Sequence, residues 1–230
     1  MKTPACIFCY SGDALPVREC ITGAIAAGLV PYVFDDSHAP LPRHMVAWIQ
    51  DNGGHHILTT FERNGNLNGT KCAVGIVRSM IHAMILCRST IAIKIDSDTL
   101  IIDASPFLEM STGVCSLEID RRDAFGCCYS LTMADAVEVY IHLSDGEVSD
   151  DVPEDLAIWG AVCELGLHHK MHNFNPAGGA FSAVPSSFHP AECQKFSVCT
   201  FGNSPRTPEG VTISMQKLNK FLQLQTKNIM

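Results

Sequence analysis

The first hundred residues alternate between apolar runs of strand length and segments whose apolar residues recur at helical spacing. Strands are expected at residues 3–10, 29–35, 56–61 and 91–95, and helices between them at 14–28, 42–51 and 70–87. Strands that alternate with helices predict a parallel sheet, and right-handed crossovers place helices on both of its faces. We therefore expect residues 1–100 to form a Rossmann-like α/β half with a mainly parallel, twisted sheet.

The pattern changes after residue 100. Further strands are expected at 113–119, 124–129, 168–174, 179–184 and 196–201, and further helices at 131–143, 154–165 and 213–226. This order predicts a smaller, mixed α+β half, residues 101–230, built on the edge of the first. Because no low-complexity linker or internal repeat separates the halves, we expect one domain over residues 1–230.

The composition excludes several classes of protein. Of the 230 residues, 47% are hydrophobic and 17% are charged, which predicts a packed core instead of disorder. The net charge of -8 argues against a nucleic-acid partner. No run of about 18 apolar residues occurs, so no integral membrane segment is expected. Eleven cysteines, an odd number scattered along the chain, predict reduced thiols in a cytoplasmic protein.

The segment from Ile91 to Thr99 constrains function most. The fourth expected strand ends in Asp96-Ser97-Asp98, and open α/β sheets bind ligands at the carboxyl ends of their strands. If the strand alternation continues, both aspartates point to the same side, where their hard oxygens suit Mg²⁺ or Mn²⁺ on a diphosphate. The alternative is a turn whose aspartates cap backbone amides.

An α/β half that ends its fourth strand with Asp-x-Asp, followed by a mixed half, resembles the GT-A-type glycosyltransferases. The resemblance implies that Asp96 and Asp98 hold a divalent metal, Mn²⁺ or Mg²⁺, on the diphosphate of a nucleotide-sugar. It also implies a UDP-sugar as the expected donor and transfer of a hexosyl group to the hydroxyl of a saccharide or other acceptor. The metal would offset the charge that develops on the leaving nucleoside diphosphate.

Other stretches match positions where this family binds its donor. The loop after the first strand, residues 10–13, would surround the base and ribose, and the acidic end of the second strand would accept a hydrogen bond from them. The loop at 63–71 is rich in glycine and asparagine and leads into a helix N-terminus suited to phosphate. The donor-binding candidates are Tyr10, Ser11, Asp36, Arg63, Asn68, Gly69, Lys71 and Asp96. Ordinary polar loops would explain the same stretches.

Glu154 and Asp155 begin the helix expected at 154–165. The helix dipole favours acidic residues in a first turn whatever the function. The resemblance implies that an acid here lies near the acceptor hydroxyl, as the general base of an inverting enzyme or as an acceptor-binding group of a retaining one. Asp155 is the first catalytic candidate and Glu154 the second.

The resemblance lacks one metal ligand. Many members of the family take a third ligand from a C-terminal histidine, but residues 197–203 contain none, which leaves His189, Asn203 or water. His168 and His172 have the spacing of a helical metal site, but Gly166 is expected to end the helix before them.

Three other functions fit parts of the pattern. A haloacid-dehalogenase-type phosphatase would use Asp96 as nucleophile and Asp98 as acid/base, but such enzymes normally begin with this motif, and residues 99–169 lack the lysine they need. A sugar nucleotidyltransferase usually has a glycine-rich, basic loop after its first strand, which residues 11–13 do not provide. A non-catalytic nucleotide-sugar-binding module is the third, and the presence of both aspartates and the acidic pair argues against it.

Overall fold

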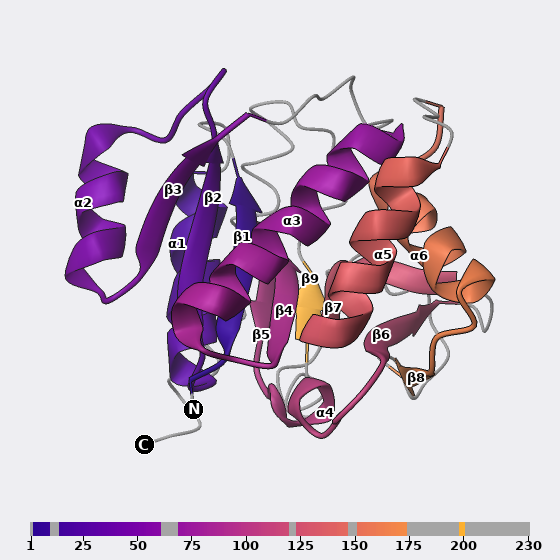
Figure 1. Ribbon diagram of the computed structural model, residues 1–230. Helices are drawn as coiled ribbons and strands as arrows, with labels where there is room; N and C mark the ends of the chain where they lie inside the picture. Colours follow the sequence, from indigo (N-terminus) through magenta and orange to yellow (C-terminus); the bar gives the residue numbers. More distant parts are fainter. Residues whose placement is uncertain are drawn as a thin grey trace.

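A seven-stranded sheet with the strand order β3-β2-β1-β4-β7-β6-β8 forms the centre of the molecule (Figure 1). The computed structural model describes residues 2–9, 14–60, 69–119, 123–146, 151–173 and 198–200. The strands are β1 (Pro4–Cys9), β2 (Val30–Asp36), β3 (His55–Thr59), β4 (Ile91–Asp96), β6 (Val114–Ile119), β7 (Asp123–Thr132) and β8 (His169–Asn173). A second, two-stranded sheet pairs β5 (Thr99–Ile101) with β9 (Val198–Thr200).

The first four strands in the order are all parallel, and the second half of the chain extends the sheet beyond them. β7 pairs antiparallel with β4, β6 pairs antiparallel with β7, and β8 pairs parallel with β6. The sheet is therefore mixed, and β4, the last strand of residues 1–100, lies at the junction of the two halves.

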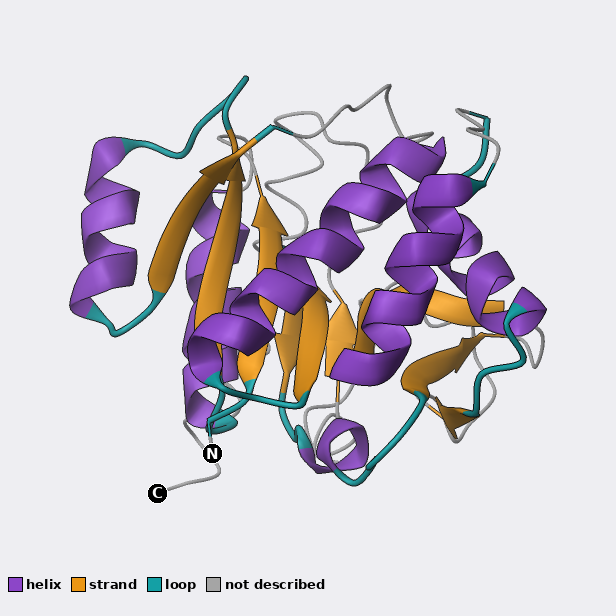
Figure 2. Ribbon diagram, viewed as in Figure 1, coloured by secondary structure: helices purple, strands orange, loops and turns teal. Residues whose placement is uncertain are grey.

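Helices cover both faces of the sheet (Figure 2). They are α1 (Ala14–Ala26), α2 (Arg43–Asp51), α3 (Gly69–Cys87), α4 (Ser105–Leu108), α5 (Met133–Asp145) and α6 (Glu154–Glu164). One core cluster joins α1, α2 and α4 to strand residues such as Ile7 and Ile93. The other joins α3, α5 and α6 to residues such as Phe8 and Ala92, which occupy the opposite face because side chains alternate along a strand.

The predicted elements of the first half are all present, and none of their ends differs by more than two residues. Gly28 follows α1 with a φ of 79°, a left-handed conformation in which glycine is unstrained, and thereby ends the helix as expected. The strands expected at 113–119, 124–129, 168–174 and 196–201 are found as β6 to β9, and the helices expected at 131–143 and 154–165 as α5 and α6. The elements expected at 179–184 and 213–226 lie outside the described residues.

α3 is the candidate membrane helix among the described residues. Its 19 residues have a mean hydropathy of 1.4, which by length and composition alone would allow it to cross a bilayer. Half of that window is buried inside the protein, and α3 packs against the sheet, α5 and α6. A helix that packs in the core of a globular fold is buried in this way. The cysteines whose side chains the structure describes are all free thiols.

Candidate functional site

The carboxyl ends of β1, β2 and β4 meet at the edge of the sheet where α3 and α6 begin. In the strand register, Phe8 pairs with Phe34 on one side and with Asp96 on the other. The rings of Phe8 and Phe34 are stacked with centroids 5.1 Å apart. The backbone N–H of Gly69, the first residue of α3, donates to the carbonyl of Val152, just before α6, at 3.0 Å. Segments far apart in the sequence thus converge at one edge.

Lys94 is a buried cation at this edge. It lies on β4 with 2% of its side chain exposed, and its Nζ donates a hydrogen bond to Oδ1 of Asp96. The same Nζ lies 5.6 Å from the ring centroid of Tyr129 on β7, within cation–π range. Burial lowers the pKa of the Lys94 ammonium, but the charges of Asp96, Tyr129 and Glu154 outweigh it and raise the pKa above its usual range.

Glu154 brings the second carboxylate to Lys94. Burial raises the pKa of Glu154, the positive charge of Lys94 lowers it, and the negative charge of Asp96 raises it further. The same charges act on Tyr129. Burial raises the pKa of its phenol, the charge of Lys94 lowers it, and the charge of Glu154 raises it. The Tyr129 hydroxyl is buried and has no hydrogen-bond partner among the described residues. Two carboxylates, one ammonium and one phenol therefore form a single electrostatic cluster.

Asp98 does not continue the alternation of β4. The strand ends at Asp96, and Ser97 and Asp98 form a turn that leads into β5. Asp96 bonds to Lys94, and after burial the charges of Asp98 and Asp96 both raise the pKa of the Cys20 thiol on α1. Cys20 Sγ also lies 3.4 Å from the Asp96 carbonyl oxygen. The alternation of β4 therefore does not extend to Asp98, and the prediction that both carboxylates serve one site stays a prediction.

The acidic end of β2 is occupied by local hydrogen bonds. Asp35 is fully buried and accepts from the Leu41 backbone N–H, with one oxygen 2.8 Å from His56 Nε2. Asp36, the predicted nucleotide ligand, accepts from the His38 backbone N–H at 3.0 Å through Oδ1. Asp36 thus reaches the expected edge of the sheet, with one oxygen held in the turn that follows β2.

The first turn of α3 carries the other predicted donor-binding residues that the structure describes. Gly69 is buried with a φ of 59°, which favours glycine, and Lys71 is exposed. Tyr10, Ser11, Arg63 and Asn68 lie outside the described residues. So do His189 and Asn203, the alternatives for a third metal ligand.

Of the two catalytic candidates, Glu154 has the closer link to the cluster. Asp155 accepts from the adjacent Leu156 backbone N–H at 2.9 Å, and its charge reaches the cluster only as a smaller contribution to the pKa of Glu154 and Tyr129. Among the described residues, no group of three or more His, Cys, Asp or Glu side chains is arranged to hold a metal ion.

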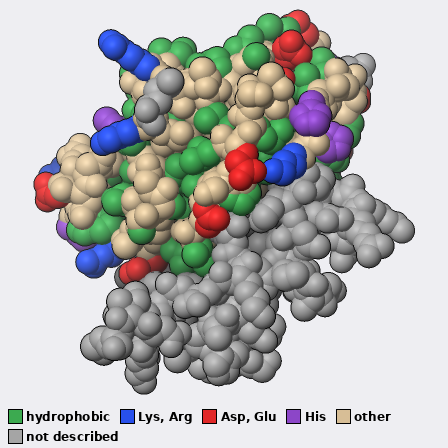
Figure 3. All heavy atoms as spheres, turned by 90° about the horizontal axis from the view of Figure 1, so that it is seen from below, with side chains coloured by type: hydrophobic (Ala, Val, Ile, Leu, Met, Phe, Trp, Pro, Cys, Tyr) green, Lys and Arg blue, Asp and Glu red, His purple; other side chains and the backbone are tan. Residues whose placement is uncertain are grey.

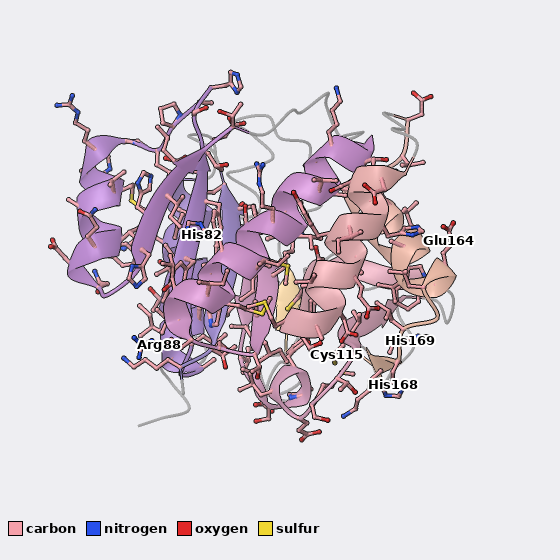
Figure 4. All side chains as sticks on the ribbon, viewed as in Figure 1. His82, Arg88, Cys115, Glu164, His168 and His169 are labelled. Carbon is pink, nitrogen blue, oxygen red and sulfur yellow. The ribbon has the colours of Figure 1, made fainter. Side chains whose placement is uncertain are left out.

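The histidines after α6 lie on or next to β8, the outermost strand on one side of the sheet. Gly166 has a φ of 63° and follows α6, so the helix ends before His168 and His172, as expected from the sequence. In the strand register, His169 is opposite Val114, Val114 is opposite Leu131, and Leu131 is opposite Ala92. His169 is therefore in line with the amino end of β4, whereas Asp96 is at the carboxyl end. Figure 4 shows His168 and His169 near β8, and Glu164 higher in the view at the end of α6.

The surface seen from below in Figure 3 lies toward the amino ends of the parallel strands. Acidic and basic side chains are interspersed there among hydrophobic and other groups, over the part of the chain that the structure describes. The charged cluster around Lys94 belongs to the opposite edge, at the carboxyl end of β4.

A solved structure has a similar fold. The glycosyltransferase involved in glycosylation of the major capsid of PBCV-1 superposes with a TM-score of 0.55 at 7% identity, covering 94% of this chain and all of that one. This chain shares the overall fold of that enzyme. The apo form of the glycosyltransferase GlyE from Streptococcus pneumoniae TIGR4 gives a TM-score of 0.48 at 13% identity, and this chain spans 45% of its length. No family model and no curated protein sequence matches the chain.

The structure brings together Asp96, Gly69 and Glu154 from the predicted set and adds Lys94 and Tyr129 to them. A signal for Lys94 was present in the sequence, since a lysine between isoleucines in a buried strand needs a charged partner. Tyr129 had no comparable signal, because only the pairing of β7 with β4 places it opposite Lys94.

Proposed function

We propose that this chain is a glycosyltransferase that moves a sugar from a nucleotide-sugar, with a UDP-sugar as the preferred donor, to an acceptor hydroxyl. The observation that carries the proposal is the convergence of Asp96, the start of α3 and Glu154 around Lys94, in a fold shared with a solved glycosyltransferase. Open α/β sheets bind their ligands at this carboxyl edge. The cysteines are consistent with the cytoplasmic location that we also propose.

The donor would occupy the edge between β2, β4 and α3. The N-terminus of α3 carries a partial positive charge that suits a diphosphate, and Lys71 in its first turn adds a cation. Asp36 would accept a hydrogen bond from the base or ribose, and Gly69 would allow close approach of the donor to the backbone. Tyr10, Ser11, Arg63 and Asn68 complete the proposed donor site.

The carboxylates present fit a divalent cation of a particular kind. Mg²⁺ is commonly held by one or two protein carboxylates and completes its shell with water and substrate phosphates. Asp96 and Asp98 provide such a pair, and Mn²⁺ accepts the same oxygen ligands. When bound, the ion would supply Lewis-acid stabilisation of the leaving diphosphate.

Glu154 is the proposed group for the acceptor hydroxyl. A carboxylate whose pKa is raised by burial is a stronger base in its ionised form than an exposed one, which suits it to remove the acceptor proton. Asp155, one residue further along α6, is the second candidate for contact with the acceptor. An inverting enzyme would need this base, and a retaining enzyme would use Glu154 to orient the hydroxyl.

Calorimetric titration with UDP and GDP, each with and without Mn²⁺, tests the proposal. We expect metal-dependent UDP binding that Asp98→Ala weakens by roughly tenfold or more, the usual cost of losing a charge-assisted contact. Asp51→Ala is the matched control, because Asp51 is an exposed aspartate at the end of α2. Absence of binding by any nucleoside diphosphate would contradict the proposal.

A further inference from the structure

Lys94 is unusual because it is a fully buried cation in the middle of an apolar strand. Its neighbours Ile93 and Ile95 are 0% exposed and belong to the core on the α1 side of the sheet. Lys94 points to the other face, where its register partner Cys6 belongs to the α3-side core. A buried ammonium is retained only where opposite charges compensate for its loss of hydration.

The compensation comes from both halves of the chain. Asp96, two residues along β4, accepts the hydrogen bond from Nζ. α6, which begins at Glu154, packs against β7 and α3, and the charges of Lys94 and Glu154 act on each other's pKa. The Tyr129 ring on β7 covers the ammonium at 5.6 Å. One cation is thus shared between a carboxylate proposed for the donor and one proposed for the acceptor.

We propose that Lys94 is a positioning residue of the site, which holds the Asp96 carboxylate at the end of β4 and draws Glu154 at the start of α6 toward it. The inference rests on the proposed function and adds a residue to the same site. Without the ammonium, two carboxylates would face each other without a compensating charge, so that both would move and an incoming diphosphate would meet greater repulsion.

The proposal predicts that removing the charge of Lys94 affects UDP binding and Mn²⁺ binding differently. In Lys94→Met, which keeps an unbranched side chain one atom shorter and removes its charge, UDP affinity measured with saturating Mn²⁺ should fall by about tenfold or more. Mn²⁺ affinity of the nucleotide-free protein should not fall, because the site has become more negative by one charge. A merely structural role would weaken both ligands together. Unchanged UDP affinity, or a parallel loss of both ligands, would overturn the proposal.

Lys170→Met is the matched control. Lys170 lies on β8 and pairs at 3.0 Å with Glu109 in an exposed salt bridge, so the same substitution there removes a lysine outside the site. UDP and Mn²⁺ affinities should remain at the level of the unmodified protein in this variant.

A double-mutant cycle tests the link to Glu154 without any nucleotide. Urea unfolding is measured for the unmodified protein, Lys94→Met, Glu154→Gln and the double variant. We expect Glu154→Gln to raise the unfolding midpoint more in the Lys94→Met background than in the original one, because it then removes an uncompensated carboxylate. Additive effects would overturn the link. If the unmodified protein binds no nucleotide, the proposed function fails, while the cycle still decides whether Lys94 and Glu154 are coupled.

Discussion

At the scale of single residues, Gly113 lies at the point where three elements meet. Its N–H donates to the Asp135 carboxylate at the start of α5, and its carbonyl accepts from Thr132 at the end of β7. Its φ is 98°, and an added Cβ would lie 2.2 Å from the carbonyl oxygen of His168. The backbone at this junction therefore requires glycine.

Replacement of Gly113 by alanine should accordingly destabilise the protein. We expect Gly113→Ala to lower the free energy of unfolding by about 2–4 kcal/mol, because both the positive φ and the close carbonyl oppose a Cβ. Gly160→Ala is the control, since Gly160 is inside α6 with no atom within 4 Å of an added Cβ. That change should stabilise by roughly 0.5–1 kcal/mol. Urea unfolding measures both, and equal effects would contradict the assignment.

Lys94 shows how far single residues can be interpreted from sequence. A lysine between isoleucines indicates a buried charge, and Asp96 two residues later is on the same face of the strand. The sequence could therefore suggest the Lys94–Asp96 pair. The second partner, Glu154, is on a helix 60 residues away along the chain, and no local pattern indicates which carboxylate approaches.

At the scale of secondary-structure elements, segments with an apolar pattern of their own were predictable, whereas β5 and α4 were not. β1, β2, β4 and α3 are rich in buried residues, and their apolar spacing is sufficient to indicate them. β5 has three residues and exists through its pairing with β9, about a hundred residues later, so local periodicity could not indicate it. α4 has four residues and begins with Ser105-Pro106.

The first turn of α6 makes stability depend on pH. Burial raises the pKa of Glu154 in the folded protein, so the folded state binds its proton more tightly than the unfolded state does. The contribution of Glu154 to stability is therefore fully present below the ordinary glutamate pKa and decreases as pH rises through the folded-state value. The free energy of unfolding should decrease over this interval.

Glu154→Gln should remove this dependence. Urea unfolding of both proteins from pH 4 to pH 8 gives the difference in unfolding free energy at each pH. We expect the difference to move in favour of the glutamine variant as pH rises, because glutamine cannot ionise. Glu138→Gln is the control, since Glu138 is exposed on α5. A difference that is independent of pH, or one that moves the other way, would show that Glu154 is not destabilised by burial.

At the scale of the whole molecule, the site lies on the junction between the two halves of the chain. Lys94 and Asp96 come from residues 1–100, while Tyr129 and Glu154 come from residues 101–230, and both halves contribute strands to the same sheet. Part of the net charge of -8 is therefore gathered at one edge, where a cation and a polar acceptor would use it. Neither half of the chain alone contains all four residues of the charged cluster around Lys94.

This arrangement predicts which reaction the intact chain performs. Incubated with a set of UDP-sugars and Mn²⁺, the protein should release UDP, through transfer or slow hydrolysis, and Asp96→Asn should reduce the rate by roughly 100-fold or more, as when one electrostatic contact to a developing charge is lost. Asp51→Asn should leave the rate unchanged, because Asp51 is exposed on α2 and away from the cluster.

The same variants separate glycosyl transfer from phosphoryl chemistry. A phosphatase that used Asp96 as its nucleophile would hydrolyse a generic phosphoester such as para-nitrophenyl phosphate, and Asp96→Asn would abolish that activity because an amide cannot form the aspartyl-phosphate. We expect no such hydrolysis from the unmodified protein. Phosphoester hydrolysis that is lost in Asp96→Asn, without UDP release from any UDP-sugar, would replace the glycosyltransferase assignment, since the fold alone does not determine the reaction.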